Sequence, residues 1–112
     1  MLSVVELRRD GWWVVVASGE LDVASAPDLR RAVVSAVADG ARQVVIDLTG
    51  VDFIDSFGLG VVIGAVKRVR AHEGRLAVVV ADGPVRRAFE LTGLDRVLEL
   101  RAGVDEVVAG PA

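Results

Sequence analysis

Residues 43–48 (QVVIDL) form an apolar run with a single charge, and a second apolar stretch, residues 57–72, begins after eight intervening residues. The first segment has the length of a strand and is apolar on both faces, which is typical of a buried parallel strand. The second predicts a helix, because its apolar residues recur at helical spacing. Gly74 is expected to end that helix, and residues 76–80 (LAVVV) predict another buried strand. Strand, helix and strand in this order predict two parallel strands joined by a crossover helix.

Two apolar segments, residues 3–8 and 12–18, precede this unit and flank Asp10-Gly11. Asp-Gly between such segments predicts a β-hairpin. The second segment is apolar on both faces, which indicates an interior strand. Because neighbours on a strand point to opposite faces, we expect one residue of the Trp12-Trp13 pair in the core and the other under a helix.

Further helices are predicted before and after the central unit along the chain. One lies between Ser25 and Asp39, since a Ser-x-x-Asp box and a proline mark its start. Another is predicted from Pro84 to Leu91, where Thr92-Gly93 follows. The remaining elements are short: a strand at residues 96–100 and a helical segment at residues 104–109.

The predicted order of elements is ββαβαβαβα, in which strands and helices alternate after the hairpin. This pattern predicts a single α/β domain over residues 1–112. Its sheet is mostly parallel, with about four or five strands, one antiparallel hairpin strand and about three or four packed helices. Residues 110–112 (GPA) are expected to be a frayed tail.

The composition excludes several classes of function. The chain has 112 residues, a net charge of −3, one histidine (His72) and no cysteine. Disulfides, Cys-ligated metal sites and sites built on several histidines are therefore excluded. The longest apolar runs have six residues, too few for a membrane span, and the acidic balance argues against nucleic-acid binding. We expect a cytoplasmic binding protein rather than an enzyme, with no metal, no cofactor, no membrane contact and no nucleic-acid partner.

Acidic residues gather in two loops expected at the carboxyl ends of strands, residues 18–24 and 49–56. Such loops are where α/β sheets place their ligand sites, and paired carboxylates there can serve acid–base catalysis or bind Mg²⁺. No histidine, lysine, cysteine or tyrosine joins them, so a solvated acidic rim is the interpretation that we favour. The acidic residues are Glu20, Asp22, Asp52 and Asp55.

Residues 58–64 (GLGVVIG) are similar to the glycine fingerprint of dinucleotide-binding folds. The third glycine comes one residue late, and the segment between strand and helix is too long for the tight turn that the fingerprint needs. Nucleotide binding at this place is therefore not favoured.

Ser56 immediately precedes the long helix and is expected at its N-cap position. Gly60 and Gly64 continue the face of the helix from Ser56 towards Lys67 and Arg68, outside the predicted buried stripe. Two glycines within a helix cost about 1 kcal/mol each relative to alanine. Close packing on the sheet is one explanation, and a surface on which another protein's backbone docks is the one that we favour. The predicted buried stripe consists of Leu59, Val62, Ile63, Val66 and Val69.

Three blocks of sequence together resemble one known family. In this combination and order, over nearly the whole chain, they resemble the bacterial anti-sigma factor antagonists of the STAS domain family. The resemblance implies a STAS-type fold. The blocks are residues 53–60 (FIDSFGLG), residues 19–29 (GELDVASAPDL) and residues 85–94 (VRRAFELTGL).

The resemblance implies a switch. In the family, the serine after the motif aspartate is phosphorylated by a partner that is both an anti-sigma factor and a serine kinase using ATP and Mg²⁺. The unphosphorylated antagonist binds this partner and releases the sigma factor, and a serine phosphatase resets the switch. By position, Ser56 is the phosphoacceptor, with Asp22 and Asp55 as its acidic neighbours. The expected partner-binding residues are Asp22, Asp55, Phe57, Gly58, Gly60, Gly64, Lys67 and Arg68.

Phe57 stands where the family usually has serine or threonine, so Ser56 has no alternative acceptor beside it. The side chain of Phe57 belongs either to the core or to the partner surface. Two alternative functions stay open. One is a STAS adaptor subunit of a transporter or signalling complex that is never phosphorylated, and the other is a small nucleotide-binding α/β protein.

Overall fold

The computed structural model describes residues 1–109, and the tail at residues 110–112 that was expected to be frayed lies outside the described residues. The order of elements along the described chain is the predicted one. The strands are β1 (Leu2–Arg9), β2 (Trp12–Leu21), β3 (Gln43–Ile54), β4 (Arg75–Val79) and β5 (Glu99–Arg101). The helices are α1 (Ala26–Ala38), α2 (Ser56–Ala71), α3 (Pro84–Leu91) and α4 (Val104–Val108), with a 3₁₀ turn at Leu94–Arg96.

The five strands form one sheet in the order β1-β2-β3-β4-β5. β1 pairs with β2 antiparallel, and every other neighbouring pair is parallel. The prediction of a mostly parallel sheet with one antiparallel hairpin strand is confirmed. β2 is an interior strand, as its apolar character on both faces indicates.

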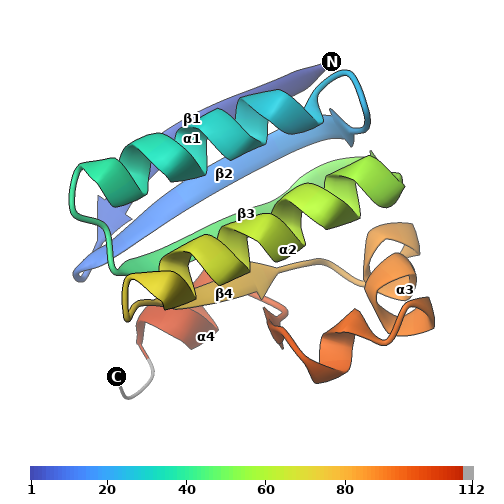
Figure 1. Cartoon of the computed structure of the whole chain (residues 1–112). Helices are drawn as coiled ribbons and strands as arrows, with labels where there is room; N and C mark the ends of the chain where they lie inside the picture. The colour runs from blue at the N-terminus through green and yellow to red at the C-terminus, as the bar shows by residue number, and fades with distance from the viewer. Residues whose placement is uncertain (110–112) are drawn as a thin grey trace.

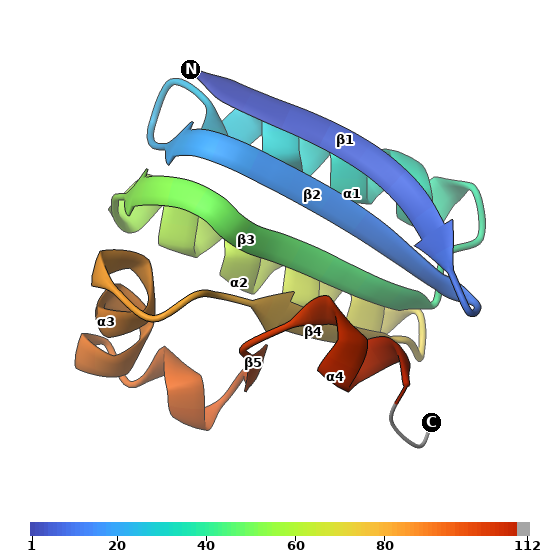
Figure 2. The ribbon, with the colours of Figure 1, turned by 180° about the vertical axis from the view of Figure 1, so that it is seen from behind.

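α1 and α2 lie side by side over one face of the sheet, and α4 lies on the opposite face (Figure 1; Figure 2). The two long helices share a face because consecutive strand–helix–strand crossovers have the same hand. They contribute Leu29, Val33, Val62 and Val66 to the main core, which Phe89 of α3 completes. The smaller cluster under α4 comprises Trp12, Val14, Val45, Ala77, Val79, Val107 and Val108.

The hairpin between β1 and β2 turns at Asp10 and Gly11, whose φ angles are 50° and 83°. Positive φ at both central residues gives the turn whose twist matches the flanking strands. The two tryptophans that follow point to opposite faces. Trp12 is buried in the cluster under α4, whereas Trp13 is partly buried against the main core, with the guanidinium of Arg8 stacked 3.3 Å from its ring centroid.

Several predicted boundaries are wrong. β2 and β3 continue to Leu21 and Ile54, so most of the expected loops at residues 18–24 and 49–56 is paired strand, with register shifts around Ser18 and Gly19. The strand expected at residues 96–100 starts only at Glu99, because a 3₁₀ turn precedes it.

The predicted start of α1 is confirmed, but the capping box expected there and the predicted end of α2 need correction. Ser25 occupies the N-cap position of α1, but its side chain makes no capping hydrogen bond. After α2, Glu73 adopts the left-handed conformation with φ of 61°, whereas Gly74 does not. Gly74 is required for another reason, since a Cβ there would lie 2.5 Å from the carbonyl oxygen of Arg42.

Candidate functional site

Asp55, and not Ser56, is the N-cap residue of α2, so the predicted cap is wrong by one position. The backbone of Asp55 is extended, and its Oδ1 accepts a hydrogen bond from the N–H of Gly58 at 2.9 Å. Ser56 is the first helical residue and is exposed. Within residues 1–109, its hydroxyl makes no hydrogen bond. The side chain that was expected to cap the helix is therefore available to other molecules.

The same carboxylate of Asp55 reaches the loop between β2 and α1. Its Oδ2 accepts a hydrogen bond from the N–H of Val23 at 3.1 Å. Asp55 thus fixes the loop that carries Asp22 against the N-terminus of α2. The prediction that Asp22 and Asp55 belong to one region of the surface agrees with this contact.

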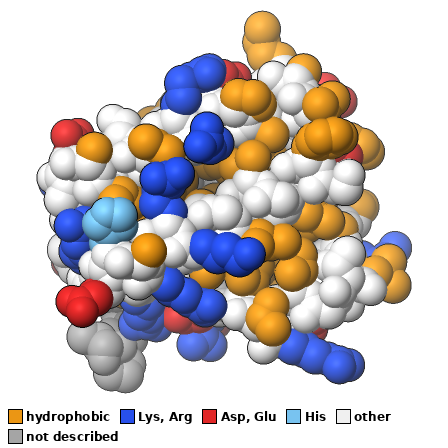
Figure 3. Space-filling model, viewed as in Figure 1, with side chains coloured by type: hydrophobic (Ala, Val, Ile, Leu, Met, Phe, Trp, Pro, Cys, Tyr) orange, Lys and Arg blue, Asp and Glu red, His pale blue; other side chains and the backbone are white. Residues whose placement is uncertain are grey.

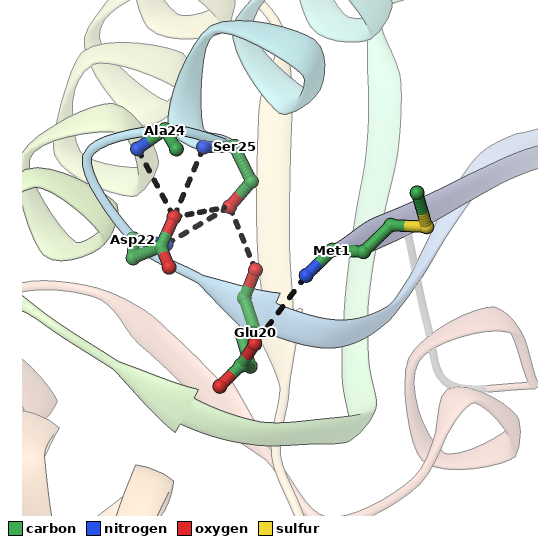
Figure 4. Close-up of polar contacts among 5 residues, drawn as sticks. All are labelled: Met1, Glu20, Asp22, Ala24 and Ser25. Carbon is green, nitrogen blue, oxygen red and sulfur yellow. Dashed lines mark hydrogen bonds and ion pairs between the residues drawn. The ribbon is translucent and has the colours of Figure 1, made fainter.

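Asp22 is engaged within its own loop, as the close-up in Figure 4 shows. Its Oδ1 accepts hydrogen bonds from the N–H groups of Ala24 and Ser25 at 3.0 and 3.1 Å. The hydroxyl of Ser25 donates to the carbonyl oxygen of Glu20 at 2.7 Å and accepts from the N–H of Asp22 at 2.9 Å. The hydroxyl of Ser25 also lies 3.1 Å from Oδ1 of Asp22 as a donor. The hydrogen bonds to Oδ1, above all the one from the backbone N–H of Ser25, lower the pKa of the Asp22 carboxyl below its usual value. The loop is therefore held in one conformation by its own polar groups.

Five of the predicted site residues line one hollow, of about 380 Å³, between α1 and α2. Arg30 and Val33 of α1 line it from the other helix. Figure 3 views this side of the molecule: basic and apolar side chains gather over the two helices, and acidic ones lie mostly near the margin. The five predicted residues are Ser56, Phe57, Gly60, Gly64 and Arg68.

The glycines of α2 fall into two kinds. A Cβ added at Gly60 or Gly64 would have no atom within 4 Å, so packing on the sheet does not explain either glycine. Gly58 is the opposite case. It is buried, and a Cβ there would lie 2.5 Å from the carbonyl oxygen of Leu21. Gly58 therefore has a packing role, and its contact with a partner stays a prediction.

The comparisons with known proteins identify the family. The sequence profile of the STAS domain matches residues 4–107. The chain belongs to the STAS domain family. It is 29% identical over 104 residues to an anti-sigma-B factor antagonist of Staphylococcus aureus (strain NCTC 8325 / PS 47), covering 93% of this chain and 96% of that protein.

Solved structures agree with the fold of this STAS domain. An anti-sigma factor antagonist from Mycobacterium paratuberculosis superposes with a TM-score of 0.89 and 33% identity, covering 97% of this chain and 92% of that one. The Bacillus cell fate determinant SpoIIAA in its phosphorylated form has a TM-score of 0.72 and 24% identity, with 97% of each chain covered. At that identity, the second likeness concerns the fold alone.

The structure places the remaining predicted residues of the STAS domain as follows. Phe57 is 59% exposed, so it belongs to the surface and not to the core. Lys67 is exposed on α2 but does not line the hollow. Asp52 is exposed on β3, in keeping with a solvated acidic rim.

In the described part of the STAS domain, metal-ligand groups and membrane-spanning helices are both absent. Among residues 1–109, no three His, Cys, Asp or Glu side chains are grouped so that they could hold a metal ion. In that same stretch, no helix combines the length and the apolar character needed to cross a membrane.

Sequence reasoning missed the contribution of α1 to the hollow. Arg30 and Val33 carry no local signal of a site, because one is an exposed arginine and the other a core valine. The only available signal is topological. Two consecutive crossover helices of one hand lie side by side on the sheet, so the outer face of one borders that of the other.

Proposed function

We propose that this STAS domain is an anti-sigma factor antagonist, and that phosphorylation of Ser56 ends its binding to an anti-sigma factor. The names of the similar proteins from S. aureus and M. paratuberculosis support the antagonist role. The proposed switch rests on the position of Ser56. This serine is the exposed first residue of α2 and borders the hollow between the two helices. SpoIIAA, which shares the fold, has been solved in a phosphorylated form, so phosphate is compatible with this fold.

In the proposed reaction, the partner anti-sigma factor is also the kinase. The Ser56 hydroxyl oxygen attacks the γ-phosphorus of Mg²⁺-bound ATP, the new O–P bond forms as the bond to ADP breaks, and a base of the kinase takes the hydroxyl proton. A serine phosphatase later cleaves the phosphoester with water. This chain supplies the hydroxyl and no catalytic group, so it is not itself an enzyme and needs no cofactor.

The switch acts on the surface and leaves the fold intact. A phosphoserine carries about −1.5 to −2 charges at neutral pH. At the start of α2 that charge meets the free N–H groups and the favourable dipole of the helix, so the domain tolerates it. A partner surface seated on a neutral hydroxyl does not, because the phosphate must be desolvated there. Far-UV circular dichroism of the phosphorylated protein should therefore keep the helical signal.

Intact-mass measurement tests the proposal. The purified chain is incubated with Mg²⁺, ATP and a candidate anti-sigma factor kinase from the same genome. We expect a gain of one phosphate in the wild type and in Ser35→Ala, which removes an exposed serine of α1, but none in Ser56→Ala. Binding to the same anti-sigma factor should persist in Ser56→Ala and weaken at least about tenfold in Ser56→Asp.

Two results contradict the proposal. Phosphate incorporation in Ser56→Ala would place the acceptor elsewhere. Tight binding without any phosphorylation, unchanged in Ser56→Asp, would favour the alternative in which the domain is a structural adaptor.

A further inference from the structure

We propose that the hollow between α1 and α2 receives an acidic, apolar segment of the anti-sigma factor, and that Arg30 and Arg68 bind its carboxylates. The inference rests on the proposed function and deepens it by naming the chemistry of the partner at that site. It adds Arg30 of α1, which the proposed switch does not use, to the docking surface.

The shape and polarity of the hollow suit a polypeptide segment. Its floor consists of apolar side chains and of glycines. The apolar side chains, between the helices, are Val33, Val61 and Ala65, and the exposed glycines of α2 are Gly60 and Gly64. The glycines leave open space, since a Cβ at either one would touch nothing within 4 Å. Backbone can approach most closely where side chains are absent, so a partner segment can lie directly on α2.

The charges around the hollow favour an acidic occupant. Arg30 and Arg68 also line a neighbouring hollow of about 560 Å³, where Arg31 joins them. No acidic residue lines either hollow in the described chain. Arg31 is paired with Asp28, whereas within residues 1–109 neither Arg30 nor Arg68 forms an ion pair. Two guanidinium groups without a partner, on opposite walls of an apolar groove, are complementary to a segment that presents carboxylates.

The same arrangement supplies a second reason for phosphorylation to end binding. Ser56 and Arg30 line the same hollow, so a phosphate on Ser56 brings negative charge to the place where the partner's carboxylates bind. The phosphate repels those carboxylates and competes with them for the guanidinium groups. The unphosphorylated chain therefore binds the segment, and the chain releases it once Ser56 carries a phosphate.

Titration calorimetry with the anti-sigma factor of the phosphorylation assay, in the presence of ADP, tests the inference. We expect Arg30→Gln and Arg68→Gln each to weaken binding about tenfold or more, because a charge-assisted hydrogen bond is lost. The matched control is Arg87→Gln, which removes the same charge from an exposed position on α3. Raising the salt concentration should weaken the wild type and the control more steeply than the two groove variants. Melting temperatures of all variants verify that the fold is retained.

The outcomes separate the inference from the proposed function. If the wild type does not bind the anti-sigma factor, both fail. If it binds and Ser56→Asp weakens binding, but the two groove variants bind like the wild type or no worse than Arg87→Gln, the inference alone is overturned. Light scattering gives one further contrary result: a dimer of the free chain that Arg30→Gln or Arg68→Gln dissociates would show that a second copy occupies the groove.

Discussion

Asp55 Oδ2 accepts a hydrogen bond from the backbone N–H of Val23 at 3.1 Å, across 32 residues of sequence, while Oδ1 of the same carboxylate caps α2. One side chain thus sets the start of α2 against the loop that leads into α1. The position of Ser56 relative to the neighbouring helix depends on that carboxylate, because Ser56 is the residue that follows it.

Replacing Asp55 should therefore destabilise the domain. Asp55→Ala removes a helix cap and a loop contact, and we expect the free energy of unfolding to fall by about 1–2 kcal/mol. Asp55→Asn should cost less, since the amide oxygen still accepts one of the two hydrogen bonds. Urea unfolding followed by circular dichroism measures both. Asp52→Ala, at an exposed carboxylate of β3, is the control and should leave the midpoint unchanged. An equal effect of Asp52→Ala and Asp55→Ala would contradict the capping role.

The glycines of α2 should respond in opposite directions to alanine. Gly60→Ala and Gly64→Ala add a methyl group in open space and should raise the free energy of unfolding by about 0.5–1 kcal/mol each. Gly58→Ala places a methyl group against the carbonyl oxygen of Leu21 and should lower it by about 1–3 kcal/mol. Thermal melts of the three variants decide this. Destabilisation by Gly60→Ala as large as by Gly58→Ala would show that Gly60 is held by packing after all.

Phe57 is exposed beside the acceptor serine and should matter for binding more than for folding. Phe57→Ala is expected to shift the melting temperature little, because most of the ring is already in water. It should weaken binding to the anti-sigma factor about tenfold, as the loss of an aromatic anchor at an interface does. Leu91→Ala, at an apolar side chain of α3 that is 81% exposed, is the matched control. Equal affinities for the wild type and Phe57→Ala would place the residue outside the interface.

The stability that Asp22 contributes should depend on pH. The backbone N–H of Ser25 lowers the pKa of this carboxyl in the folded state below its usual value of 3.8. A carboxyl with a lowered folded pKa stabilises the fold above the unfolded pKa, and this contribution is lost as the pH falls through the folded pKa.

The difference in unfolding free energy between the wild type and Asp22→Asn should therefore be largest near neutral pH and shrink below about pH 4. Urea unfolding at a series of pH values measures it, with the exposed Asp82→Asn as control. A difference that stayed constant down to about pH 2.5 would mean that the ionised carboxylate is not what holds the loop.

The elements that could be predicted from the sequence are those marked by a run of buried apolar residues. β3 as far as Leu48 and β4 belong to this group. The helix α3 was predicted from other signals, namely Pro84 at its start and Thr92-Gly93 after its end. The extension of β3 to Ile54 could not be predicted, because residues 49–54 alternate glycine, polar and apolar types and are held by pairing with β2. A hydrophobic pattern indicates which residues are buried. This end of β3 is paired with β2 without being fully buried, so the pattern does not indicate a strand there.

Only part of the candidate site could be predicted, because local sequence patterns do not show contacts between distant segments. Ser56, Gly60 and Gly64 share one helix face, and helical spacing alone brings them together. That Asp55 and not Ser56 is the N-cap could not be predicted, since both residue types cap helices. The N–H of Val23, which also binds the Asp55 carboxylate, comes from a distant part of the chain. Arg30 lies on another helix, so its place in the site depends on tertiary structure.

The tandem tryptophans of β2 have a practical consequence. Trp13 is packed towards the layer that holds α1 and α2, and Trp12 is packed with Val107 and Val108 of α4. Variants that keep a single tryptophan therefore give an optical probe for each side of the sheet. Binding at the α1–α2 surface should change the fluorescence of Trp13 more directly. The fluorescence of Trp12 shows whether the packing on the opposite face of the sheet changes as well.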